Sequence, residues 1–226
     1  NTPVRFKKYD LIMDEDIAII NKNTRNEKIK NFFVNNTKKL IIAISAIVLI
    51  IFGYFIYEDL KKKNKIKLAN RYNLVTIKFI SGDKNKFENE LIDIVNEKDR
   101  TYSPLALYFL IDNNIVNENK KINELFDVVI NETSLEEEIK NLVIYKKALF
   151  NSDFESENNL IQILSPVINS DSVWRSHALY LMAEYFYYKN QKQKSKDFFN
   201  QILTLENSNP NIRIETQKRL NRDFSD

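Results

Sequence analysis

The chain has 226 residues, of which 43% are hydrophobic and 12% aromatic, so it is long enough and apolar enough to fold. It contains only two glycines, four prolines and no cysteine, which argues against sheet hairpins, glycine-rich phosphate loops, disulfides and thiolate chemistry. The formal net charge is +3, yet residues 79–226 carry 18 basic and 24 acidic side chains, whereas residues 58–78 carry seven and two. An acidic C-terminal region argues against a nucleic-acid-binding surface.

The first 39 residues are polar and precede any long apolar run. The sequence does not begin with Met, and Met13 opens the acidic stretch MDEDIAII. We therefore expect residues 1–12 to be a spurious upstream extension of the reading frame.

Residues 40–57 (LIIAISAIVLIIFGYFIY) form an uncharged run of 18 residues. As a helix rising about 1.5 Å per residue, the run spans roughly 27 Å, close to the hydrocarbon thickness of a bilayer. A buried core helix would show a polar stripe, and a cleaved signal peptide would be shorter and end in small residues. The run therefore predicts a single transmembrane helix. Its basic flanks are nearly balanced, so charge alone leaves the orientation open.

A hydrophobic motif recurs in residues 58–226 with a period near 34. NELIDIV at residues 89–95 returns as NELFDVV at 123–129, and ALYFL at 106–110 returns as ALYLM at 178–182. Apolar residues follow helical spacing between polar breaks, and Ser134 with Glu137 predicts a capping box. We therefore expect an all-α array of antiparallel helix pairs: 60–80 with 84–97, 103–115 with 118–131, 134–151 with 156–169, and 173–189 with 191–206, followed by a closing helix at 209–222.

The last unit matches the large and small positions of the 34-residue tetratricopeptide pattern. The residues that match are Leu179, Met182, Ala183, Phe186, Ser195, Phe199 and Ile202. Small side chains at Ala183 and Ser195 predict that two helices approach closely there, with phenylalanines filling the adjacent space. Asn190 is expected to take the turn that glycine usually makes.

The order of an acidic start, one apolar span and degenerate repeats ending in VWRSHALYLMAEYFYYKNQKQKSKDFFNQIL resembles a bacterial family over residues 13–222. This is the tetratricopeptide-like family that includes the ancillary subunit of the SecYEG translocon. The resemblance implies an inner-membrane protein with residues 1–39 in the cytoplasm, 40–57 in the membrane and 58–226 as a TPR-like α-solenoid in the periplasm. It also implies translocon subunits or periplasmic chaperones as partners.

Aromatic residues near the start of the last unit are candidates for partner binding, namely Trp174, Tyr180 and Tyr187, although such spacing also suits a core. His177 is the only histidine, and without cysteine it predicts no metal site. The acidic run Glu136 to Glu138 is explained by the dipole of the helix that it opens, so it predicts no acid–base pair.

None of the glycine-rich, nucleophile-elbow or zinc-protease motifs occurs, so we expect no enzyme and no cofactor. The favoured hypothesis is a membrane-anchored, TPR-like protein-binding module that aids protein export. The alternative is a cell-envelope scaffold that coordinates division or wall-synthesis proteins, and crosslinking to native partners would distinguish the two.

Overall fold

A computed structural model describes residues 24–79 and 84–224. This part of the chain is helical and contains no strand, which confirms the all-α prediction. The chain divides into two compact units, Asn1–Lys65 and Ile66–Asp226. The expectation about Met13 and residues 1–12 falls outside the described residues.

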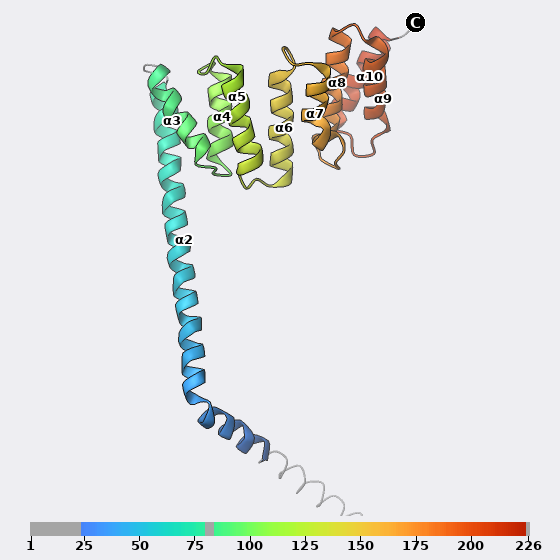
Figure 1. Cartoon of the computed structure of the whole chain (residues 1–226). Coiled ribbons are helices and arrows are strands. Elements are labelled where there is room, and N and C mark those ends of the chain that lie inside the picture. Colours follow the sequence, from blue (N-terminus) through green and yellow to red (C-terminus); the bar gives the residue numbers. More distant parts are fainter. Residues whose placement is uncertain (1–23, 80–83, 225–226) are drawn as a thin grey trace, which may run out of the picture. The chain divides into compact units, whose positions relative to one another are not determined.

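Helix α2 runs from Thr37 to Phe79 and contains the predicted apolar run (Figure 1). Residues 24–35 are also helical and end in a turn at Asn36, where the Thr37 hydroxyl donates to the carbonyl of Phe33 at 2.8 Å. Of the helices described at residues 24–79 and 84–224, only α2 is long and apolar enough to cross a membrane. None of its apolar window is buried, which distinguishes it from the core helix of a soluble protein.

The remaining helices all belong to the second unit. They are α3 (Lys84–Asn96), α4 (Tyr102–Asp112), α5 (Asn119–Asp127), the π-helix η1 (Val128–Glu132), α6 (Glu137–Asn151), α7 (Glu157–Ile168), α8 (Arg175–Tyr188), α9 (Lys192–Thr204) and α10 (Pro210–Asp223). When α5 and η1 are taken together, these bounds lie within three residues of those expected from the hydrophobic period. The separate helix expected at 60–80 is instead the C-terminal part of α2, which continues from the apolar run without a break.

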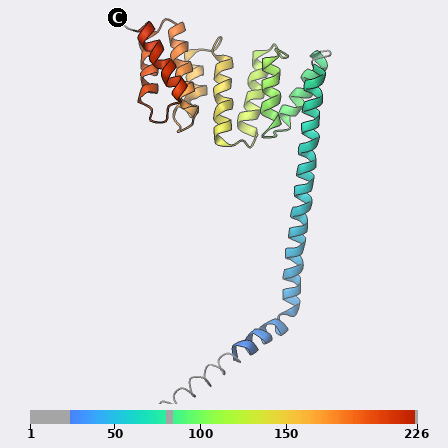
Figure 2. The same ribbon diagram turned by 180° about the vertical axis from the view of Figure 1, so that it is seen from behind.

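Helices adjacent in the chain pack against one another in the second unit, as Figures 1 and 2 show. Helix α6 packs on α7 and α8 on α9, while α10 contacts both α8 and α9. Helix α3 packs on α4 more extensively than α4 packs on α5, which differs from the expected pairing of 103–115 with 118–131. The core consists of three groups of buried side chains, centred on Phe126, Phe186 and Phe199. Because every group draws on several helices, each helix is held mainly by its apolar face.

The connections use residues with known turn preferences. Asn190 has φ 58°, so the prediction that it replaces a glycine at the turn is confirmed. The hydroxyl of Ser156 accepts from the backbone N–H of Asn159 at 3.3 Å and caps α7. Asn209 caps α10 in the same way and is followed by Pro210 at the first helical position.

The predicted capping box at the start of α6 is wrong. The helix begins at Glu137 and its N-cap residue is Glu136, which makes no side-chain cap hydrogen bond. The preceding π-helix ends at Glu132, and the backbone of Thr133 is extended. The N–H of Leu135 donates to the carbonyl of Thr133 at 2.9 Å. This turn moves the helix start beyond Ser134, so its hydroxyl is not at the N-cap position.

Candidate functional site

Polar contacts in the second unit repeatedly join side chains about one predicted period apart. The Ser172 hydroxyl donates to Glu138, 34 residues earlier, at 2.8 Å. The ammonium of Lys121 donates to Glu88, 33 residues earlier, also at 2.8 Å. In both contacts, side chains about one predicted period apart lie next to one another.

Three large aliphatic side chains are exposed at the same register. Leu105, Ile139 and Val173 are 34 residues apart and have exposed fractions of 41%, 42% and 63%. Leu105 lies in the first turn of α4, Ile139 in the first turn of α6, and Val173 just before α8. We call these residues the aliphatic stripe. Single exposed apolar residues are ordinary, and the recurrence of three of them at one register is what distinguishes this set.

A groove lies beside the first two members of the aliphatic stripe, between α4 and α6. Its volume is about 450 Å³, and most of its lining is apolar. At its rim, Nη1 of Arg100 lies 3.8 Å from Oε1 of Glu136. The lining residues are Arg100, Thr101, Pro104, Leu105, Tyr108, Leu135, Glu136, Ile139 and Leu142.

Tyr108 is one of the residues that line this groove. Its hydroxyl is buried and makes no hydrogen bond among the described residues. Burial raises the pKa of the Tyr108 phenol, because desolvation disfavours the phenolate. The ammonium of Lys146, on α6, lies 4.7 Å from the centre of the Tyr108 ring.

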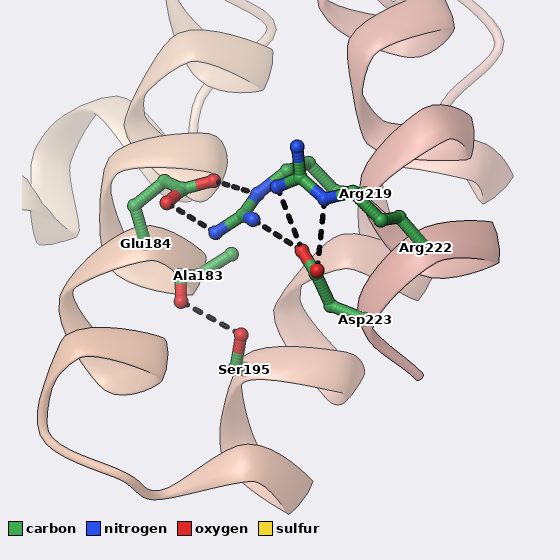
Figure 3. A network of polar contacts seen from close by, with 6 residues as sticks. All are labelled: Ala183, Glu184, Ser195, Arg219, Arg222 and Asp223. Carbon is green, nitrogen blue, oxygen red and sulfur yellow. Dashed lines mark hydrogen bonds and ion pairs between the residues drawn. The ribbon is translucent and has the colours of Figure 1, made fainter. Parts of the chain in front are cut away.

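The residues that match the tetratricopeptide pattern are all buried. Ala183 and Ser195 are 0% exposed, and the Ser195 hydroxyl donates to the Ala183 carbonyl at 2.8 Å (Figure 3). Such a contact between a side chain of α9 and the backbone of α8 requires small side chains on both helices. The other matching residues, Leu179, Met182, Phe186, Phe199 and Ile202, have exposed fractions of at most 1%.

Trp174 is partly buried at the start of α8. Its ring stacks on Tyr145 of α6, with centroids 5.9 Å apart and an interplanar angle of 20°. The ring of His177 lies 5.0 Å from that of Trp174. Desolvation lowers the pKa of His177, because burial disfavours the imidazolium. Trp174 thus already has partners within its own chain.

The two candidate tyrosines of α8 are also partly buried. The ring centroids of Tyr180 and Phe199 are 5.5 Å apart. Burial raises the pKa of the Tyr180 phenol to about 12, and the negative charge of Glu184 raises it further. Tyr187 lies under Arg219, whose guanidinium carbon is 4.5 Å from the ring centre. A partner-binding role for these aromatics stays a prediction.

Charged residues join α8 to α10 beside Tyr187. Figure 3 shows Glu184 of α8 facing Arg219 of α10, with distances of 2.6 Å from Nε to Oε1 and 2.7 Å from Nη2 to Oε2. Arg219 also donates to Asp223, which accepts from Arg222 as well. The hydrogen bonds to Glu184 raise the pKa of Arg219, and those from Arg222 lower the pKa of Asp223; the attraction of opposite charges adds to both effects. This network holds α10 against the last helix pair.

Chemistry-bearing side chains are sparse in the described part of the chain. There, no three His, Cys, Asp or Glu side chains come together as metal ligands. Glu137 and Glu138 lie in the first turn of α6, where the helix dipole favours carboxylates.

Sequence reasoning did not single out the aliphatic stripe. Helical spacing places Ile139 on the apolar face of its helix, and periodicity alone does not tell a core position from an exposed one beside it. The available signal is the recurrence of a large aliphatic residue at Leu105, Ile139 and Val173, 34 residues apart.

Comparisons with protein-family models, with curated proteins and with solved structures find no match.

Proposed function

We propose that this chain is a membrane-anchored protein-binding module whose helical unit holds a segment of another protein in the groove between α4 and α6. The aliphatic stripe is the observation that supports this proposal. Leu105 and Ile139 line the groove and remain exposed, so an occupant would remove both from water. Because about two fifths of each side chain is exposed, burying that part stabilises a complex by roughly 1 kcal/mol per residue before the costs of association.

The groove suits a peptide segment. Its volume of about 450 Å³ can hold a few side chains, and ligand-binding clefts are of this size. Arg100 and Glu136 provide one charge of each sign at the rim, where specificity is usually set.

The proposal includes a TPR-like α-solenoid of antiparallel helix pairs for the second unit. Its support is that polar contacts and the aliphatic stripe follow the same spacing near 34 residues. In a solenoid, each unit contacts its neighbours, and equivalent positions form a continuous surface.

The proposal also places α2 across the bacterial inner membrane, with the helical unit in the periplasm and residues 1–39 in the cytoplasm. The exposed apolar run of α2 supports the anchor, whereas the side of the membrane rests on the family resemblance. The expected partners are then translocon subunits or periplasmic chaperones, and the role is assistance to protein export.

Site-specific photocrosslinking in intact cells tests this proposal. A photoreactive residue would replace Leu105 or Ile139, and the matched control would replace Lys120, an exposed position outside the groove. Protease added to spheroplasts of the same cells reports the topology. We expect a protease-sensitive helical unit, with crosslinks to export components from the groove positions only.

A substitution separates binding from mere proximity. Ile139→Asp should reduce crosslinking from position 105 about tenfold or more, because a carboxylate would be desolvated by an apolar occupant. Ile214→Asp is the control, since Ile214 is exposed on α10 and does not line the groove. Equal crosslinking from groove and control positions, or a protease-protected helical unit bound to cytoplasmic proteins, would overturn the proposal.

A further inference from the structure

Lysines gather directly after the apolar run, within one continuous helix. Lys61, Lys62, Lys63 and Lys65 belong to α2 and to the first unit, and all four side chains are exposed. No turn separates them from Tyr57, the last residue of the run, so their distance from the run follows from helix geometry alone.

The helix rise places these lysines at a definite depth. At about 1.5 Å per residue, Lys61 lies roughly 6 Å and Lys65 roughly 12 Å beyond Tyr57 along the axis. The headgroup layer on each side of the hydrocarbon core is about 5–8 Å thick. Lys61 therefore falls within this layer, and the flexible side chain of Lys65 can reach back into it.

The lysines also surround the helix. Successive residues are rotated by about 100°, which spreads Lys61, Lys62 and Lys63 over three sides of the axis. Lys63 is paired with Asp59 at 2.7 Å, but no ion pair in the described part of the chain includes Lys61, Lys62 or Lys65. Unneutralised charge thus faces the surroundings in several directions.

We infer that Lys61, Lys62, Lys63 and Lys65 form a collar that binds the phosphate groups of anionic phospholipids. The inference rests on the membrane anchorage in the proposed function. Each ammonium is attracted to phosphate, and a basic residue at an anionic surface strengthens association about fivefold. Their place beside the apolar run favours lipid over a protein or nucleic acid as the source of that phosphate.

Lipid selectivity of the full chain tests the collar. The protein would be reconstituted into phosphatidylcholine vesicles that contain spin-labelled phosphatidylglycerol or spin-labelled phosphatidylcholine, and the fraction of motionally restricted label would be compared. We expect the anionic label to be preferred about fivefold or more. The preference should fall strongly in high salt, because screening weakens exposed charges.

Matched variants assign the effect. The quadruple variant K61Q/K62Q/K63Q/K65Q should show nearly equal association of both labels, whereas K120Q/K140Q/K192Q/K196Q, which removes four lysines of the helical unit, should keep the preference. No preference in the wild type, or an unchanged preference in the collar variant, would overturn the inference. Salt-sensitive self-association in pure phosphatidylcholine would also overturn it, by assigning the lysines to an acidic protein surface.

Alkaline carbonate extraction of the same vesicles keeps the two proposals distinguishable. Wild-type protein that resists extraction but shows no lipid preference contradicts the collar alone. Wild-type protein that is extracted contradicts the membrane anchor, and with it the proposed function.

Discussion

Arg219 of α10 and Glu184 of α8 form a two-pronged ion pair, with Nε and Nη2 of the guanidinium at 2.6 and 2.7 Å from the two carboxylate oxygens. The Arg219 side chain is only 14% exposed. Parallel hydrogen bonds of this kind add geometric specificity to the attraction of opposite charges. The pair therefore fixes both the position and the rotation of α10 against α8.

Arg219→Ala should loosen α10. The lost charged hydrogen bonds and the carboxylate left unpaired amount to about 2 kcal/mol, which corresponds to roughly 30-fold faster amide hydrogen exchange in α10. Arg219→Lys should restore little of this stability, because an ammonium cannot make the two parallel hydrogen bonds of the guanidinium. Exchange measured on the full chain in detergent would check this, with Lys218→Ala as the control, since that side chain is 67% exposed and its ion pair with Glu215 lies within α10. Equal exchange in all these proteins would show that α10 is held by its apolar contacts alone.

Close approach of α8 and α9 at Ala183 and Ser195 leads to a second prediction. Ala183→Leu inserts a large side chain where both residues are fully buried, and overpacking of this kind costs about 1–3 kcal/mol. Ser195→Ala removes only the hydrogen bond to the Ala183 carbonyl, at a cost of about 1 kcal/mol. Thermal unfolding followed by circular dichroism should rank the variants in this order, with exposed Asn200→Ala unchanged. The reverse order would mean that the contact is polar rather than steric in origin.

Much of the helical organisation could be predicted because burial imposes a period of 3.6 residues on the apolar positions. In α7, for example, Leu160, Leu164 and Val167 follow this period and are fully buried, and Ser156 caps the helix start. Asn190 was predictable for another reason, since asparagine tolerates positive φ better than most residues.

Other features depend on contacts that no local pattern specifies. The π-helix at Val128–Glu132 breaks the 3.6-residue period and displaces the start of α6, so Ser134 resembles a cap but does not act as one. Tyr180 and Tyr187 are covered by Phe199 and Arg219 from other helices, whereas neighbouring Tyr188 is 81% exposed. The groove likewise requires two helices, α4 and α6, that are separated by a third in the chain.

Tyr180 leads to a prediction about alkaline pH. Its folded-state pKa is about 12, above the value of 10.0 for an unburied phenol, because burial disfavours the phenolate. Between these two pKa values, the folded state keeps a proton that the unfolded state releases. Tyr180 therefore leaves the free energy of unfolding unchanged below pH 10 and lowers it as the pH rises from 10 to 12. Tyr180→Phe should reduce this fall, as measured by chemical unfolding across that range.

Tyrosinate absorbance gives an independent check of the same group. Tyr180→Phe should remove one phenol from the titration near pH 12. Tyr188→Phe is the matched control, because Tyr188 belongs to the same helix and is exposed. If the wild type and Tyr180→Phe lost the same free energy of unfolding between pH 10 and 12, the hydroxyl of Tyr180 would not be desolvated in solution.

The apolar run of α2 leads to the last prediction. Lysines at Ile47 and Ile50 would lie near the centre of the run, where a charged residue opposes membrane insertion by about 3 kcal/mol. Leu74→Lys with Ile77→Lys is a matched control on the same helix, with the same spacing and also at exposed positions. Alkaline carbonate should extract the Ile47→Lys/Ile50→Lys protein from native membranes and leave the control embedded. Retention of the Ile47→Lys/Ile50→Lys protein would mean that two charges do not remove this run from the membrane. Extraction of both variants would mean that the helix is held by protein contacts rather than by lipid, because carbonate releases proteins that are bound only to other proteins.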